Sequence, residues 1–293
     1  MNDVPSYLEA LLHTPLLKRA AAAGALVGLA CAALSPFVVL RRLAFVGDGM
    51  AHAAFGGLGL ALFLFAGSKS DDPAVQLTML GFCLALAVAV GRATRRREGG
   101  QDEGGLAADS AIGIAFSVSM ALGALLITLR YRREPQYAPS WEGYLFGSLT
   151  TIGQGQVWIT LALAAAVLIA LVVLHKELAF YTYDETLAEL SGLPVGFLHY
   201  LFLILLVLTV VLAARIVGIV LVSSSLILPG VAALACSSRL TTALWVAGLV
   251  GVASYQLGLY ASYRWNVPPG AAVILVQFAA VAAAQVYKRA RGA

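Results

Sequence analysis

The apolar run FLHYLFLILLVLTVVLAARIVGIVLVSSSLILPGVAALAC, residues 197–236, decides the fold class of this chain. Only Arg215 and Gly218 interrupt it. A helix that crosses the hydrocarbon core of a bilayer needs about 20 residues, so the run is too long for one span and short for two complete ones. Backbone in a bilayer must satisfy its own hydrogen bonds, which favours helices with a tight turn or a re-entrant element near Gly218.

Composition extends this conclusion to the whole chain. The 293 residues are 60% hydrophobic and 12% charged, and their mean hydropathy is +0.88. These values are typical of a polytopic membrane protein and not of a soluble domain. At about 20 residues for each span, the chain holds roughly eight or nine helices and no soluble catalytic domain. We therefore predict an all-α protein with a single transmembrane domain over residues 1–293.

The apolar runs place the spans near residues 17–40, 47–66, 74–91, 107–129, 154–174, 197–214, 216–236, 240–262 and 267–288.

The charges are few and clustered. The net charge is +4, and arginines gather between apolar runs at residues 41–42, 95–97 and 132–133. This pattern is typical of membrane topology, and we predict no nucleic-acid partner. The run 95–97 and the basic C-terminus favour the cytoplasmic side, which with nine spans leaves the N-terminus outside.

The small residues and the cysteines give weaker evidence about structure and function. The three cysteines stand singly in apolar stretches, so neither a disulfide framework nor a thiolate metal site is indicated. GxxxG matches are about as frequent as chance predicts for this glycine content, although Gly24 with Gly28 can mark a close helix contact.

Two connections then face the cytoplasm and are candidates for docking a partner. The longer one, HKELAFYTYDETLAELSGLPV at residues 175–195, predicts a short amphipathic helix that carries Asp184, Glu185 and Glu189. Such a helix can lie along the membrane and present acids to water, and a solvated connector is the alternative. The shorter connection covers residues 236–242 and follows the apolar segment LILPGVAALA.

Asp48 and His52 are the strongest candidates for chemistry. They lie in RRLAFVGDGMAHAAFGGLGLALFL, residues 41–64, and an ionisable side chain in a span costs about 2.5–3.5 kcal/mol on insertion scales, which marks function by default. Four residues apart on a helix, their Cβ atoms are about 5–6 Å apart. A carboxylate oxygen and an imidazole nitrogen can then share a divalent cation at about 2.0–2.2 Å each. Without a thiolate, this pair favours Mn, Fe or Zn over Cu(I).

Two ligands form an incomplete shell. A two-fold dimer could add a second pair and supply four protein ligands at the subunit interface. In the alternative interpretation, Asp48 caps the second helix and His52 hydrogen-bonds to it without a metal, because the sequence Gly47–Asp48–Gly49 after a basic turn resembles a helix start.

Several motifs are absent. The sequence has no GxxxxGK[ST] motif for ATP phosphates, and neither HExxH nor GxSxG. No span carries the string of acids expected of a proton or sodium relay. We therefore expect that the protein is not an enzyme, has no cofactor of its own, and takes any transport energy from another subunit.

The residues resemble the ABC-3 family, the membrane permeases of ABC transporters for zinc, manganese and ferrous iron. The most specific piece is VVLRRLAFVGDGMAHAAFGG, in which an arginine-rich turn precedes a GDxxxH helix. Further pieces occur in the family's order: DSAIGIAFS (109–117), YLFGSL (144–149), YDETLAELSGLPV (183–195), VGIVLVSSSLILPGVAA (217–233) and LGLYASYRWNVPPGAAVILV (257–276).

The resemblance implies a type II importer-like permease in the cytoplasmic membrane. It implies that Asp48 and His52 are the metal ligands of the pathway. It also implies a homodimer, two cytoplasmic ATPase subunits that bind the ATP, and an extracytoplasmic solute-binding protein that delivers the Zn, Mn or Fe ion.

For ATPase docking, the resemblance points to residues 236–242 and the preceding LPGVAALAC, with the acidic segment beside it. The family's basic residue after ILPxxxA is replaced here by Leu234, and Arg239 is the nearest substitute. Gly56 stands where many relatives have a proline, which changes the expected bend of the second helix.

The predicted function is therefore permeation of a divalent transition metal, driven by a partner ATPase. A proton-coupled secondary metal transporter and a membrane scaffold without transport activity are the alternatives.

Overall fold

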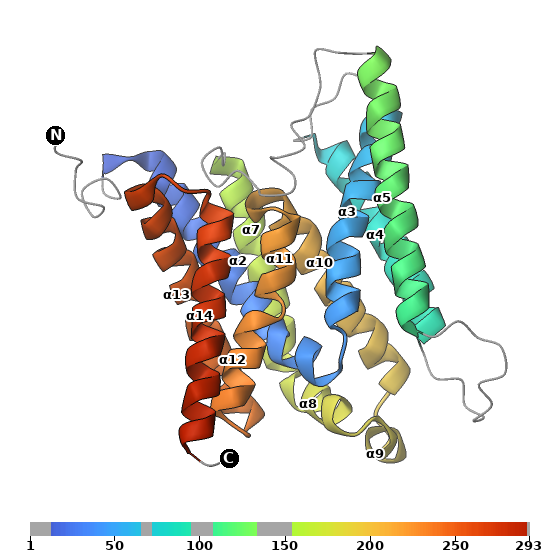
Figure 1. The fold of residues 1–293 in the computed structure, drawn as a ribbon. Helices are drawn as coiled ribbons and strands as arrows, with labels where there is room; N and C mark the ends of the chain where they lie inside the picture. The colour runs from blue at the N-terminus through green and yellow to red at the C-terminus, as the bar shows by residue number, and fades with distance from the viewer. Residues whose placement is uncertain (1–12, 66–71, 95–107, 134–153, 292–293) are drawn as a thin grey trace, which may run out of the picture. The chain divides into compact units, whose positions relative to one another are not determined.

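The protein is described here from a computed structural model that covers residues 13–65, 72–94, 108–133 and 154–291. Every regular element in these ranges is a helix, which confirms the all-α prediction (Figure 1). The motif piece at 144–149 lies outside the described residues. The helices are α2 (Pro15–Leu40), α3 (Ala44–Leu64), α4 (Pro73–Thr94), α5 (Ala108–Arg133), α7 (Gln154–Val173), α8 (His175–Tyr183), α9 (Glu185–Leu190), α10 (Val195–Val217), α11 (Ile219–Ser225), α12 (Leu228–Cys236), α13 (Leu240–Trp265) and α14 (Pro269–Ala290).

Seven segments in the described residues, with α11 and α12 counted together as one, are long and apolar enough to cross a membrane. The bent pair α7–α8, with 69° between its parts, makes an eighth if it is one broken span. The predicted span at 197–214 falls on α10, whose apolar part Val195–Val211 is shorter than the others. The structure therefore agrees with the lower end of the predicted range of eight or nine spans.

The apolar run that decides the fold class is broken twice. The first break is at Gly218, which has a φ of 86° and precedes α11. Glycine is favoured there because it has no Cβ to clash in the left-handed region. Arg215 does not take part in this break, since it lies inside α10. A second break, which the sequence did not indicate, separates Ser225 from Leu228.

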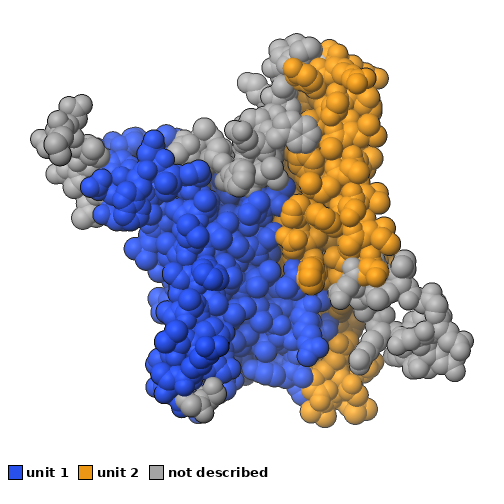
Figure 2. All heavy atoms as spheres, in the orientation of Figure 1, with its two compact units in different colours: residues 1–44, 142–183, 212–293 blue, residues 45–141, 184–211 orange. Residues whose placement is uncertain are grey.

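The helices form two compact units, coloured in Figure 2. Unit 1 comprises residues 1–44, 142–183 and 212–293, and unit 2 comprises residues 45–141 and 184–211. The chain passes between the units several times, so neither unit is a contiguous segment. The single domain over residues 1–293 stays a prediction.

Unit 1 is built around close packing of α2 against α13. A Cβ added to Gly251 would lie 2.6 Å from the carbonyl oxygen of Gly28, and one on Gly24 would meet the Tyr255 ring at 3.2 Å. Small residues let two helix backbones approach in this way, and packing drives association where lipid removes the hydrophobic driving force. The close contact expected at Gly24 and Gly28 is confirmed.

In unit 2, glycines likewise allow α3 and α5 to pack closely. A Cβ on Gly59 would lie 2.6 Å from the Cα of Gly123, and one on Gly56 would lie 2.6 Å from the carbonyl oxygen of Ser119. The glycine-rich half of α3 is therefore fixed against α5. This packing holds the helix that carries Asp48 and His52.

Candidate metal site on helix α3

A short basic turn sets the start of α3. Arg41 is the C-cap of α2, Arg42 adopts a φ of 57°, and α3 begins at Ala44. Asp48 therefore lies in the second turn of the helix and not at its N-cap. The cap expected in the alternative interpretation is therefore wrong, because the helix begins one turn earlier than Gly47–Asp48–Gly49 suggested. Its other part, in which His52 hydrogen-bonds to Asp48 without a metal, stays a prediction.

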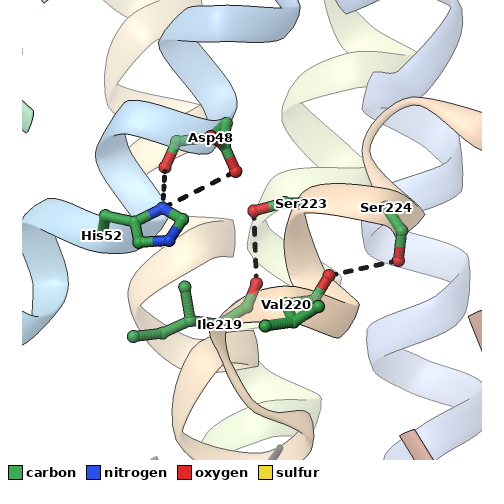
Figure 3. A network of polar contacts seen from close by, with 6 residues as sticks. All are labelled: Asp48, His52, Ile219, Val220, Ser223 and Ser224. Atoms are coloured by element: carbon green, nitrogen blue, oxygen red, sulfur yellow. Dashed lines mark hydrogen bonds and ion pairs between the residues drawn. The ribbon is translucent and has the colours of Figure 1, made fainter. Parts of the chain in front are cut away.

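The predicted helical spacing brings Asp48 and His52 together (Figure 3). The Nδ1 atom of His52 lies 3.6 Å from Oδ1 of Asp48 and 3.0 Å from the backbone oxygen of Asp48. When Nδ1 carries the proton, it donates to that carbonyl, and Nε2 becomes the ring nitrogen able to bind a cation.

Packing against α5 orients the imidazole. The His52 ring meets the ring of Phe116 edge to face, with centroids 4.5 Å apart and planes at 90°. The His52 side chain is 19% exposed, whereas the Asp48 side chain is 44% exposed. The aromatic contact holds the ring in one orientation while leaving the carboxylate accessible.

The separation between the two side chains suits a shared cation. For Zn²⁺, ligand bonds of about 2.1 Å to each atom and the observed 3.6 Å give an angle at the ion of roughly 120°, near the tetrahedral value that Zn²⁺ prefers. In this arrangement Nδ1 would bind the ion and would give up its hydrogen bond to the Asp48 carbonyl. With the other tautomer, Nε2 would bind the ion instead.

The two side chains remain a pair within the described residues. No group of three or more His, Cys, Asp or Glu side chains there could hold a metal ion. Two protein ligands leave most of the coordination shell of a transition metal open. A second pair from another copy of the chain stays a prediction.

The acidic docking candidates lie at α9. Asp184 is the N-cap of this helix, and its Oδ1 accepts a hydrogen bond of 2.9 Å from the Leu187 N–H. Glu185 is in the first turn and Glu189 near the end. The predicted helix is thus present, although the carboxylate of Asp184 is used in capping and the predicted segment divides into α8 and α9.

The other docking candidates lie around the connection between α12 and α13. Leu234 is on α12, partly buried against a cluster of alanines that includes Ala233 and Ala247. Arg239 is the N-cap of α13, is exposed, and its N–H donates to Ser237 Oγ at 3.1 Å. Arg239 therefore presents its side chain outward, whereas Leu234 packs on its own unit.

The sequence did not indicate a polar cluster that lies in unit 1. Ser35, fully buried in α2, accepts a hydrogen bond of 2.7 Å from the Gly230 N–H and donates one of 3.2 Å to the Ile227 carbonyl. The hydroxyl thus satisfies backbone groups at the start of α12. By contrast, Ser223 and Ser224 of α11 bond to carbonyls of their own helix (Figure 3).

Further polar contacts join elements of unit 1. Gln277 Nε2 donates to Ser225 Oγ at 3.0 Å, and this oxygen lies 3.1 Å from the Tyr255 hydroxyl. Arg41 donates from Nη1 to the Tyr181 carbonyl at 2.8 Å, and its guanidinium lies 3.7 Å from the centroid of the Tyr181 ring. Ser35 and Gln277 are uncharged, so the presence of ionisable groups in spans does not point to them. The signal that could have found them is a polar residue within an apolar run.

A chain whose described residues form helices only, with at least seven candidate spans and an acid–imidazole pair on one of them, has the make-up of a membrane permease. The model of the ABC 3 transport family matches residues 13–288. The chain belongs to this family, the permease subunits of ABC transporters, and lies in the cytoplasmic membrane.

Known relatives match nearly the whole chain. The manganese transport system membrane protein MntC of Halalkalibacterium halodurans is 33% identical over 277 residues, which cover 94% of this chain and 88% of that protein. The manganese import system permease protein ScaB of Streptococcus gordonii is 26% identical over 93% of this chain and 91% of its own length. The solved structure of PsaBC from Streptococcus pneumoniae in complex with Fab superposes with a TM-score of 0.80 at 26% identity, covering 97% of this chain and 98% of that one.

Proposed function

We propose that this chain is the permease subunit of an importer for a divalent transition metal, with Mn²⁺ as its principal substrate and Asp48 and His52 as ligands of the ion in transit. The observation that carries the proposal is the 3.6 Å separation of Asp48 Oδ1 and His52 Nδ1 on one face of α3. Relatives named as manganese permeases support the choice of ion. Zn²⁺ and Fe²⁺ accept the same ligand types.

Ligand chemistry fits a transit site better than a storage site. Mn²⁺ stands at the weak end of the affinity order for a given set of N and O ligands. Two ligands therefore hold it loosely, and an ion that has to leave quickly needs such weak binding. A carboxylate and an imidazole still favour a dehydrated transition metal over Na⁺ or K⁺.

In this proposal, other subunits supply the energy for transport and select the ion. Two copies of the chain form the translocation unit, two ATPase subunits dock on the cytoplasmic side, and a solute-binding protein delivers the ion. The exposed Arg239 at the start of α13 and the exposed acids Glu185 and Glu189 of α9 supply the contacts to the ATPase. Leu234 packs on the alanine cluster beside the first segment, and Asp184 caps α9 in the second.

The test is uptake of radioactive Mn²⁺ by cells whose only manganese importer contains Asp48→Ala or His52→Ala. Both variants should reach the membrane in normal amounts and lose at least nine-tenths of the uptake. The matched control is His13→Ala, since His13 is exposed and precedes α2. Normal uptake in both pathway variants would remove Asp48 and His52 from the proposal.

A second measurement separates this function from a proton-coupled transporter. Membrane vesicles depleted of ATP should take up no Mn²⁺ even with an imposed proton gradient, and uptake should return when ATP is supplied on the cytoplasmic side. Uptake driven by the proton gradient alone would favour the secondary transporter.

A further inference from the structure

Unit 1 contains a groove that has no role in the proposed ion pathway. Its volume is about 380 Å³, within the range of about 300–1,000 Å³ that is usual for small-molecule sites. It lies between α2, α7 and α13, and its walls are almost entirely apolar. They include Leu29, Phe37, Leu168, Val172, Leu244 and Trp245.

The length of the groove matches one leaflet of a bilayer. On α2 the lining residues extend from Leu29 to Phe37, a distance of about 12 Å at 1.5 Å per residue. One half of the hydrocarbon core is about 15 Å deep. Because the lining helices are long enough to span the membrane, the groove runs roughly in the direction of the lipid chains.

Polar groups gather at one end of the groove only. His175, the first residue of α8, and Thr241, in the first turn of α13, line that end. Lys176 follows His175 and is exposed, and Arg239 precedes Thr241 by two residues and is also exposed. The neighbouring acid, Glu177, has its Oε2 atom buried. Of the charged residues near this end, Lys176 and Arg239 are exposed and positive, whereas Glu177 is part-buried.

An aromatic side chain one helical turn from Thr241 indicates the depth of the membrane–water boundary. Trp245 lines the groove, lies in the second turn of α13, and is 75% exposed. Tryptophan prefers the headgroup level of a bilayer, where its ring sits in the apolar layer and its N–H reaches polar groups. The polar end of the groove thus coincides with headgroup depth.

We propose that this groove binds an acyl chain of an anionic phospholipid, with the phosphate held at the end lined by His175 and Thr241 and the exposed Lys176 beside it. Basic groups beside an apolar slot between spans suit an anionic headgroup, and one lysine near such a surface contributes about fivefold in affinity. In the predicted orientation this is the cytoplasmic leaflet, in which anionic lipids are concentrated.

Native mass spectrometry of the purified full-length protein tests this site. The protein is delipidated and titrated with phosphatidylglycerol or with phosphatidylcholine of the same acyl chains. Phosphatidylglycerol should bind at one high-affinity site per chain, about fivefold more tightly than phosphatidylcholine. Lys176→Gln should abolish this difference, whereas the matched control Lys288→Gln, on the last turn of α14, should leave it unchanged.

A second variant tests the slot for the acyl chain. Gly248 lines the groove, and a Cβ there would meet only Leu29, at an ordinary 3.4 Å. Gly248→Leu should therefore fold, fill the groove, and weaken binding of both lipids at least tenfold. Equal effects of Lys176→Gln and Lys288→Gln, or wild-type binding by Gly248→Leu, would overturn the proposal.

A second copy of the chain is the rival occupant. If Trp245→Cys forms a disulfide between two copies in high yield in native membranes, and Gly248→Leu dissociates the dimer, the groove is a subunit interface and the lipid site is refuted. No such disulfide is expected if a lipid occupies the groove.

Discussion

The hydroxyl of Ser35 is expected to stabilise the broken segment α11–α12 more than any serine that bonds within its own helix. Ser35 is fully buried and makes two contacts across 195 and 192 residues of sequence, with the Gly230 N–H and the Ile227 carbonyl. The Gly230 N–H is one of the first four of α12 and has no partner inside the helix. Ser35→Ala leaves it buried and unbonded, at almost unchanged volume.

The size of the effect follows from the two bonds. A buried donor left without a partner costs about 1–3 kcal/mol, and loss of a helix N-cap costs about 0.5–2 kcal/mol. Hydrogen bonds between membrane helices average about 0.6 kcal/mol, because the unfolded chain in a micelle also finds partners. We expect Ser35→Ala to lower the free energy of unfolding by about 1–2 kcal/mol, measured by unfolding in sodium dodecyl sulfate from mixed micelles.

The matched control is Ser224→Ala. The Ser224 hydroxyl bonds to the carbonyls of Val220 and Leu221 in its own turn, at 3.3 and 3.0 Å. Those carbonyls keep their helical bonds without it, so the loss should be below about 0.5 kcal/mol. If the two variants are equally stable, the capping role of Ser35 is refuted.

Two further stability predictions use the same assay. Gly59→Ala should destabilise the protein by about 1–3 kcal/mol, since its Cβ would lie 2.6 Å from the α5 backbone. The control, Gly81→Ala, has nothing within 4 Å of the added Cβ and should stabilise the protein by up to about 1 kcal/mol. Equal effects of the two variants on stability would contradict the close packing of α3 against α5. Arg41→Lys should lose the planar contact with Tyr181 and lower stability by about 1 kcal/mol, whereas the same change at exposed Arg42 should have little effect.

The spans could be predicted because the bilayer imposes a length and a composition on each one. Every predicted run coincides with a helix or with a broken helix such as α11–α12. The break after Ser225 could not be predicted, because VLVSSSLILPG is uniformly compatible with a helix until Pro229. What permits the break is Ser35, which lies almost 200 residues away in sequence and supplies the missing hydrogen bonds.

In the candidate site, too, some features are set by residues close in sequence and others by residues far away in sequence. The spacing of Asp48 and His52 is a local property of α3, so their proximity followed from the sequence. The edge contact of His52 with Phe116 depends on how α3 packs on α5, which is set by glycines at close approach. A one-turn error in the start of α3 was enough to suggest that Asp48 is a cap. The basic turn at 41–43 ends α2 and allows α3 to begin directly at Ala44.

The exposure of the pair argues that its surroundings are not lipid. Asp48 is 44% and His52 19% exposed in the single chain, and a carboxylate against acyl chains costs up to about 2.5–3.5 kcal/mol on insertion scales, the full value applying at the centre of a span. Intramembrane acids therefore face protein or a water-filled cavity. An accessible carboxylate beside an imidazole whose ring is fixed by Phe116 is the arrangement expected where a hydrated ion exchanges some of its waters for protein ligands and then departs.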